Sequence, residues 1–349
     1  MMAPLCLPCP IKALDEESLE HLVMSLGYEK YRSHQLIRWL YQKGVSSYAE
    51  MSDLPDGLLA ALAQSAPLTT PKIIRTDISP SDLCRKYLLA LHDGVTIESV
   101  GIPDGRRLTV CISTQAGCPL GCTFCATGRA GFVRDLSVGE IVDQANVVAR
   151  DFDRRVTNVV LMGQGEPFLN YDSCMAALRF INSSFGIGIG ARHITVSTVG
   201  LLDGIRRFAE EPGQYTLAIS LHSAVQKTRD QLMPGVRQHT LPELRAALEE
   251  YTTRTGRRVS LEYAFISSEN DSDSQLRSLI DFCSGLLCHV NLMACNPGPT
   301  HAERLSSQRL AIFKTALRRA GIPATIRVSR GSDINAACGQ LSQTHRSGG

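Results

Sequence analysis

Three cysteines stand close together in one short segment. Cys118, Cys122 and Cys125 are separated by three and two residues. Three thiolates at this spacing can ligate three iron atoms of a [4Fe–4S] cube and leave the fourth iron open to a small chelating molecule. Zinc is the competing interpretation, but zinc prefers four ligands, usually in two separated pairs, and no clear fourth ligand follows. The spacing therefore favours an iron–sulfur cluster.

The chain around these cysteines alternates short β-rich runs with amphipathic helical patterns. We predict strands at 108–113, 158–162, 193–198, 215–220, 258–266, 289–293 and 324–328, and helices at 138–149, 174–181, 201–208, 241–251, 275–283 and 307–320. This alternation is typical of parallel βα units. Six units and one extra strand predict an α/β fold, a partial (βα)6 TIM-like barrel. In such barrels the chemistry lies on the loops after the strands.

Residues 1–100 have a different pattern. Helical periodicity recurs at about 15–26, 31–42 and 58–62, and two short strands, 86–91 and 96–100, flank the turn residues Asp93 and Gly94. We therefore expect a small helical accessory domain with a hairpin over residues 1–100. The barrel core and a C-terminal segment would occupy residues 101–341, and 342–349 would be a disordered tail.

Polar and small residues follow four of the predicted barrel strands. Each group is weak evidence alone, because tight turns also use such residues. Together they would converge at the mouth of the barrel, beside the cysteine loop, and form a cofactor pocket. These residues are Gly165 and Glu166 after the second strand, Ser197 in the third, Ser220, Leu221 and His222 after the fourth, and Asn296 after the sixth.

Composition narrows the class of protein. The 349 residues are 44% hydrophobic with a net charge of +2, which excludes a mainly disordered chain. We find no apolar run of about 18 residues and no signal-peptide pattern at the start, so we expect a cytoplasmic protein without a membrane span. In a reducing compartment, clustered cysteines favour metal or redox chemistry over structural disulfides.

Charge is concentrated at the C-terminal end. Residues 301–349 hold eight Lys and Arg against Glu303 and Asp333. A basic end suits a polyanionic partner such as RNA. Charge alone nevertheless favours the simpler interpretation of a solvated helix face at 314–319.

Longer motifs make the sequence similar to one family. It resembles the RlmN/Cfr family of radical S-adenosylmethionine (SAM) RNA methyltransferases, and the RlmN branch most closely. The resemblance covers nearly the whole chain. The motifs are YRSHQLIRW at 31–39, MSDLP at 51–55, IESV at 97–100, CISTQAGC at 111–118, CATG at 125–128, ITVST at 194–198, LAISLH at 217–222, VNL at 290–292 and DINAACGQL at 333–341.

The resemblance implies two cofactors and a set of site residues. A [4Fe–4S] cluster would be held by the three cysteines, and SAM would be bound by the polar residues at the strand ends. Cys338 would carry the methyl group as S-methylcysteine, Cys111 would be its partner thiol, and Glu98 would accept a proton. Without the family, Cys338 and Cys111 would be interpreted as buried inert thiols, and Glu98 as a solvated edge charge.

The implied reaction is methylation of carbon 2 of an adenosine in 23S rRNA, with tRNA as a further substrate. One SAM would methylate Cys338, and a second would yield a 5′-deoxyadenosyl radical that abstracts hydrogen from that methyl group. The carbon would then add to the adenine ring, and release by the second thiol would leave a Cys111–Cys338 disulfide. An electron donor such as flavodoxin or ferredoxin is implied, and we expect a monomer.

Two alternatives stay open. Methylation at carbon 8, as in the Cfr branch, is the first, although Pro167 after Glu166 favours carbon 2. A non-catalytic iron–sulfur or zinc RNA-binding module is the second. RNA would be held by the helical N-terminal domain and a basic face around Arg318, Arg319, Arg327 and Arg330. The sequence departs from the family pattern at Gln164, Phe168, Ala294 and Cys295, and we expect these changes to touch the pocket wall.

Overall fold

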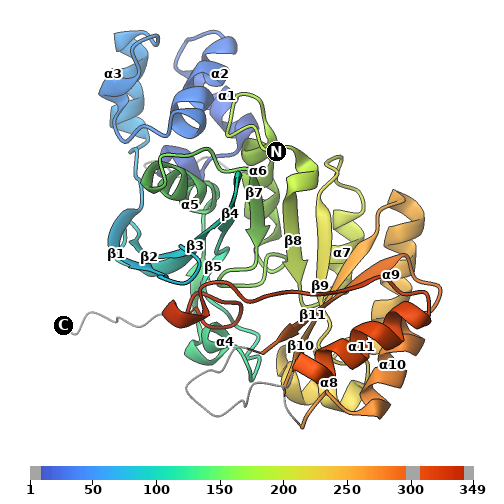
Figure 1. The fold of residues 1–349 in the computed structure, drawn as a ribbon. Helices are drawn as coiled ribbons and strands as arrows, with labels where there is room; N and C mark the ends of the chain where they lie inside the picture. The colour runs from blue at the N-terminus through green and yellow to red at the C-terminus, as the bar shows by residue number, and fades with distance from the viewer. Residues whose placement is uncertain (1–8, 267, 296–306, 342–349) are drawn as a thin grey trace.

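The computed structural model describes residues 9–266, 268–295 and 307–341, and its centre is one curved ten-stranded sheet (Figure 1). Seven neighbouring strands are parallel, as the sequence predicts, and each begins and ends within two residues of the predicted strand. This confirms the α/β barrel-type fold. The parallel strands are β4 (Arg107–Cys111), β7 (Asn158–Leu161), β8 (Ile194–Thr198), β9 (Thr216–Ser220), β10 (Val259–Phe265), β11 (Cys288–Ala294) and β12 (Ala324–Ile326).

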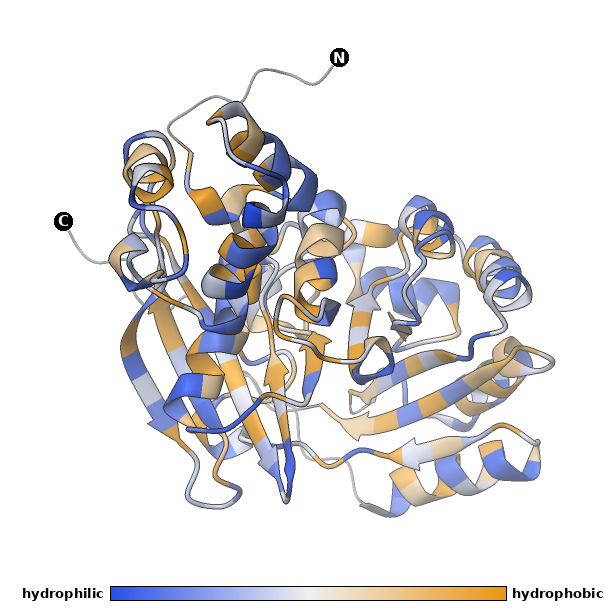
Figure 2. Ribbon diagram, turned by 90° about the horizontal axis from the view of Figure 1, so that it is seen from above, coloured by the Kyte–Doolittle hydropathy of each residue, from blue (hydrophilic) through white to orange (hydrophobic). Residues whose placement is uncertain are grey.

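Helices cover the outer face of the sheet (Figure 1). Figure 2 shows hydrophobic residues gathered on the strands and on the helix sides that face them, as expected for helices that bury one apolar stripe. All six predicted helices are present, and the short α4 and α8 were not predicted. The helices are α4 (Ala126–Ala130), α5 (Val138–Asp151), α6 (Tyr171–Asn182), α7 (Leu202–Phe208), α8 (Gln226–Leu232), α9 (Leu241–Thr255), α10 (Asp273–Cys283) and α11 (Ser307–Arg319).

Three antiparallel strands extend the sheet on its N-terminal side: β1 (Lys72–Ile78), β2 (Arg85–Ala90) and β3 (Thr96–Asp104). The predicted hairpin is confirmed, because β2 pairs with β3 across the Asp93-Gly94 turn. Strand β1 was not predicted. It is an edge strand with mostly exposed positions, so it lacks the alternation that marks a half-buried strand. The result is a mixed sheet.

The N-terminal helices are α1 (Glu16–Ser25), α2 (Tyr31–Ile37), which continues as a π-helix over Arg38–Gln42, and α3 (Asp56–Ser65). A buried ion pair joins this region to α5, since Lys12 Nζ lies 2.8 Å from Asp143 Oδ1. The predicted boundary at residue 100 falls inside strand β3, which pairs with β4 of the parallel sheet. The division into two domains at that residue stays a prediction. Short 3-10 turns occupy Ile11–Ala13, Tyr48–Glu50, Ala191–His193, Pro234–Val236 and Ser332–Ile334.

After β12, which is one edge strand of the sheet, the chain crosses in front of the sheet toward β3 (Figure 1). The turn between β1 and β2 holds the first half of this segment. Asp82 accepts a hydrogen bond from the Gly331 amide at 2.7 Å, and Ser79 donates to Asp333 at 2.9 Å. We call residues 327–341 the C-terminal segment. It brings Cys338 in front of the parallel strands.

Among the described residues, no helix combines the length and the apolar character needed to cross a membrane.

Candidate active site

A small two-stranded sheet presents the cysteine loop. Strands β5 (Gln115–Gly117) and β6 (Phe132–Asp135) pair antiparallel on either side of it. The Cys118 amide donates to the Gly131 carbonyl at 2.9 Å. Gly117 has φ +79, and a Cβ there would lie 2.0 Å from the same carbonyl oxygen, so only glycine fits. The loop therefore begins and ends at fixed points of this small sheet.

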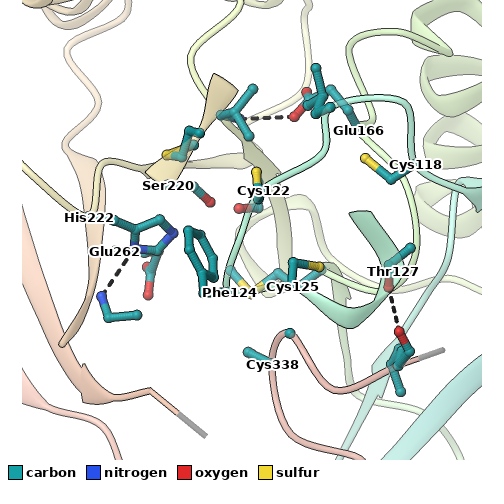
Figure 3. Close-up of a pocket in the computed structure, with 18 of the residues that line it drawn as sticks. Cys118, Cys122, Phe124, Cys125, Thr127, Glu166, Ser220, His222, Glu262 and Cys338 are labelled. Atoms are coloured by element: carbon teal, nitrogen blue, oxygen red, sulfur yellow. Dashed lines mark hydrogen bonds between the residues drawn. The ribbon is translucent and has the colours of Figure 1, made fainter. Parts of the chain in front are cut away.

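Cys118, Cys122 and Cys125 line one cavity at the C-terminal ends of the parallel strands (Figure 3). We call it the cysteine cavity. Burial raises the pKa of Cys118 to about 11 and raises that of Cys122 further, and the nearby Cys125 adds to both shifts. A thiolate in this cavity therefore needs a positive partner, and a metal centre supplies one.

The spacing of the three sulfur atoms separates the two metal interpretations. Tetrahedral zinc, with zinc–sulfur bonds of about 2.3 Å, holds its thiolates roughly 3.8 Å apart. Within the described part of the chain, these three cysteines do not form a group whose ligand atoms all lie within 4.8 Å of one another. The three thiols as placed therefore do not form a preformed zinc site of three thiolates.

Two glycines bring the loop after β7 against β4 and β5. A Cβ on Gly163 would lie 2.7 Å from the backbone of Ile112, and one on Gly165 would lie 2.6 Å from the Gln115 side chain. Gly165 also has φ +99. The close approach explains why this motif needs glycine, and it places Glu166 at the cavity wall.

Glu166 is buried, and both carboxylate oxygens are occupied. One accepts the Phe168 amide at 3.0 Å. The other accepts the Val199 amide at 2.9 Å (Figure 3). Burial raises the pKa of Glu166 to about 7, although these hydrogen bonds act in the opposite direction and lower it. The side chain thus ties together the loops after β7 and β8 and presents a carboxylate that a ligand ammonium group would keep ionised.

His222 lies on the opposite wall, beside Phe124, with its ring centroid 4.8 Å from that ring (Figure 3). Burial lowers the pKa of His222 to about 3, so the ring is neutral near pH 7. Its Nδ1 accepts the Ala264 amide at 3.0 Å, which places the proton on Nε2. His222 can therefore donate one hydrogen bond from Nε2 and carries no charge.

The structure brings most of the predicted SAM-site residues together. The cysteine cavity is lined by Gly165, Glu166, Ser197, Ser220 and His222. Leu221 is not part of that lining. Its side chain lies in the core, and its amide donates to the Glu262 carbonyl at 3.0 Å. Asn296 lies outside the described residues.

A second cavity lies between the parallel strands and the C-terminal segment. We call it the barrel cavity. Its volume is about 530 Å³, against about 160 Å³ for the cysteine cavity. Cys111 lines only the barrel cavity, whereas Cys338 lines both cavities. Both predicted reaction thiols therefore face the barrel cavity, and Cys338 lies where the two cavities adjoin, a place that we call the passage.

The two thiols lie within electrostatic reach of each other. Burial raises the pKa of Cys111 to about 12, and the nearby Cys338 adds to this shift. The charge of Cys338 also makes the largest contribution to raising the pKa of Arg327. One guanidinium therefore lies within electrostatic reach of both thiols.

Glu98 lines neither cavity. It is fully buried, and its Oε1 lies 3.4 Å from Lys86 Nζ. It shares a face of β3 with Val100, which packs in one apolar cluster with Cys111 and Ala336. Glu98 is thus one strand away from Cys111, and its role as a proton acceptor stays a prediction.

Two charged residues at the passage were not predicted to lie there: Glu262 was missed, and Arg327 was given a different role. Glu262 of β10 is buried and lines both cavities, and its Oε2 lies 3.9 Å from Arg327 Nη1. A carboxylate within an apolar strand was a signal that could have found it. Arg327 was expected on an RNA-binding face with Arg318, Arg319 and Arg330, yet it lines both cavities.

The departures from the family pattern have different outcomes. Ala294 and Cys295 line the cysteine cavity, as expected. Gln164 and Phe168 do not. Gln164 is buried under β3, where its Oε1 accepts the Glu98 amide at 3.3 Å. The departure from the family pattern at Gln164 therefore changes the surroundings of Glu98 and does not alter the wall of the cysteine cavity.

Comparisons with known proteins agree with this geometry. Residues 112–280 match the model of the radical SAM superfamily, and residues 11–68 match that of the ribosomal RNA large subunit methyltransferase N-terminal domain. A Pelotomaculum thermopropionicum protein named "probable dual-specificity RNA methyltransferase RlmN" is 43% identical over 95% of this chain and 90% of its own length. A Synechococcus protein of the same name is 43% identical over 95% of both chains.

The chain belongs to the RlmN family of radical SAM methyltransferases. A solved structure, a radical SAM methyltransferase from Sphaerobacter thermophilus, has the same fold. It is 43% identical, with a TM-score of 0.90 over 96% of this chain and 99% of its own. The expected family and fold are thereby confirmed.

The cofactors of the family are a [4Fe–4S] cluster and SAM. The residues fit both groups. Cys118, Cys122 and Cys125 come from one loop and would hold three irons of a cluster, while Cys295 and Cys338 line the same cavity from other elements. Glu166 and the neutral His222 supply a hydrogen-bond acceptor and a donor in that cavity.

Proposed function

We propose that this protein methylates carbon 2 of an adenosine in 23S rRNA, and also acts on tRNA, through an S-methylcysteine at Cys338. The observation that carries the proposal is that Cys338 lines both cavities. A methyl carrier must face the methyl donor and then the acceptor. A thiol at the passage between two cavities can meet both.

When bound, the cluster and SAM supply a methyl group and a carbon-centred radical. The chain supplies the two sulfur atoms. Cys338 takes up the methyl group as a thioether. Later the Cys111 thiolate attacks the Cys338 sulfur, and the bond from that sulfur to the transferred carbon breaks. The carbon leaves with the electron pair and takes up a proton to become the methyl group on the base, and a disulfide between the two cysteines remains. Arg327 lies near both thiols, and its charge acts against the burial that raises the pKa of Cys111, the thiol that must attack as a thiolate.

The substrate class rests on the relatives and on the N-terminal region. The curated relatives carry the name of dual-specificity RNA methyltransferases, and the N-terminal helices match a domain of a ribosomal RNA methyltransferase. Pro167 favours carbon 2 over carbon 8. Reduction by a flavodoxin or a ferredoxin stays a prediction.

Reconstitution without oxygen tests the proposal. The protein with its cluster, SAM and a reductant should methylate 23S rRNA, and chromatographic retention of the modified nucleoside separates 2-methyl- from 8-methyladenosine. Cys338→Ala should abolish methylation while the cluster spectrum remains. Cys111→Ala should trap a covalent protein–RNA adduct on a denaturing gel. RNA methylation by Cys338→Ala would refute the carrier role, and a product methylated at carbon 8 would refute the proposed regiochemistry.

A further inference from the structure

A cysteine from a distant part of the chain lines the cysteine cavity together with the three loop cysteines. Cys295 directly follows β11, and its amide donates to the Phe265 carbonyl, at the end of β10, at 3.0 Å. The ends of two parallel strands therefore hold its backbone in place. Cys295 is one of the departures from the family pattern, and the proposed reaction gives it no role.

The charges around Cys295 place it near the cysteine loop. Burial raises the pKa of Cys295, and the charge of Cys125 adds to this shift. Burial also raises the pKa values of Cys118 and Cys122, and Cys125 adds to both of those shifts. Cys125 therefore lies within electrostatic reach of the two other loop thiols and of Cys295.

The fifth thiol of the cavity has different neighbours. Cys338 lies on the C-terminal segment, and its charge acts on Cys111 and Arg327. Both of these residues line the barrel cavity. Cys295 thus lies on the side of the cysteine loop, and Cys338 lies on the side of the second reaction thiol.

We propose that Cys295 is a fourth, exchangeable ligand of the [4Fe–4S] cluster, which binds the open iron when SAM is absent and leaves it when SAM binds. The inference concerns the cofactors of the family, and it does not depend on the RNA reaction proposed above.

The chemistry of the exchange is balanced without an oxidant or a reductant. Thiolate is the ligand that iron takes in such clusters, and four thiolates leave no iron of the cube open. The Cys295 thiol gives up its proton to water when its sulfur binds iron. The amino and carboxylate groups of SAM then replace this sulfur, which takes a proton back. The oxidation states of iron and sulfur do not change.

A fourth ligand from the chain would have two measurable effects. It would hold the iron that a cube with three protein ligands loses first on oxidation. It would also compete with SAM. If Cys295 is bound in about nine molecules out of ten, only about one tenth of the protein is ready to bind SAM, and the apparent Kd is about tenfold higher.

Oxidation of the reconstituted protein without SAM tests the first effect. Ferricyanide removes an iron that has no protein ligand and leaves a [3Fe–4S] cluster, which EPR detects. We expect wild type to keep its cube and Cys295→Ala to convert, and SAM should protect Cys295→Ala because it occupies the open iron. The matched control is Cys338→Ala, which removes another thiol of the same cavity and should resist oxidation like wild type.

SAM binding to the oxidised, cluster-loaded protein tests the second effect. Cys295→Ala should bind SAM about tenfold more tightly than wild type, because no thiolate has to be displaced. Cys338→Ala should keep the affinity of wild type. Cys295→Ser is a second variant, in which a hydroxyl replaces the thiol with little change in size. Because a hydroxyl is a poorer ligand for cluster iron, Cys295→Ser should also convert on oxidation.

The outcomes decide the proposal without any measurement of RNA methylation, so a failure of the proposed function would not affect them. Equal conversion of wild type and Cys295→Ala would overturn the proposal. Conversion of Cys338→Ala but not of Cys295→Ala would assign the fourth ligand to Cys338 and would also overturn it. If neither Cys295 variant takes up a cluster, wild type decides: conversion without SAM would overturn the proposal, and resistance of both wild type and Cys338→Ala would support it.

Discussion

The Ala126 amide donates a hydrogen bond to the Gly339 carbonyl at 2.7 Å. Ala126 directly follows the third cysteine of the loop, and Gly339 directly follows Cys338. One hydrogen bond therefore joins the segment that would hold the cluster to the segment that would carry the methyl group. Thr127 adds a second link, because its hydroxyl donates to the Leu341 carbonyl at 2.6 Å.

Removing the Thr127 hydroxyl should misplace Cys338. In Thr127→Val the Leu341 carbonyl loses its donor, at a cost of about 1 kcal/mol in the free energy of unfolding. We expect methylation of Cys338 by SAM to slow by about tenfold, because the carrier segment is less well positioned. Peptide mass spectrometry over time measures this rate. Thr123→Val is the matched control, since Thr123 donates to Leu232 and not to the C-terminal segment. Equal rates in the two variants would contradict the positioning role.

Arg229 should raise the midpoint potential of the cluster. This arginine is buried and donates to the Val199 carbonyl, and its charge acts against the burial that raises the pKa of the Cys122 thiol. A positive charge beside a cluster favours the reduced state, which carries one more negative charge. Arg229→Met should therefore lower the midpoint potential in an EPR-monitored redox titration, and Arg229→Lys should restore most of it. An unchanged potential in Arg229→Met, with the cluster intact, would contradict this role.

Cys111 should react slowly with alkylating agents. Burial raises its pKa to about 12, so at neutral pH it is a thiol and only the minor thiolate reacts. Iodoacetamide should modify the exposed Cys338 first. The rate at Cys111 should rise about tenfold per pH unit between pH 7 and 9, because the thiolate fraction does. Labelled peptides quantified by mass spectrometry check the order, and faster labelling of Cys111 would contradict it.

The buried pair of Lys12 and Asp143 should stabilise the N-terminal region strongly. Lys12→Met leaves a carboxylate buried without its partner, which should cost about 3–5 kcal/mol of unfolding free energy. Lys30→Met breaks the exposed pair with Glu20 and should cost far less, because water screens an exposed ion pair. Denaturant titrations measure both, and equal costs would contradict the assignment.

The free energy of unfolding of Lys12→Met should also depend on pH. Burial raises the pKa of Asp143, and in Lys12→Met no lysine opposes this shift. A carboxyl group whose pKa is higher in the folded state binds its proton more tightly there. Stability is therefore lost as the pH rises above the unfolded value. Lys12→Met should lose more stability than wild type between pH 5 and 8.

The order of the barrel strands and helices could be predicted from the sequence. Each parallel strand is buried on both sides or lines a cavity, so it forms a short β-rich run, and each outer helix has one apolar face. The cysteine loop could be predicted for a similar reason, because its three ligands are neighbours in the chain. Spacing along the chain is enough to predict a metal site when all of its ligands come from one short segment.

Glu262, Arg327 and the edge strand β1 could not be predicted, because their positions depend on the neighbours they meet in the folded chain. Arg327 has the same side chain as the exposed Arg330, and only the path of the C-terminal segment places one in the cavities and the other at the rim. The sequence alone determined which residues can hold a cluster. The tertiary structure decided that Cys338, separated from Cys111 by more than two hundred residues, lies at the passage between two cavities, because that contact depends on how the C-terminal segment packs across the sheet.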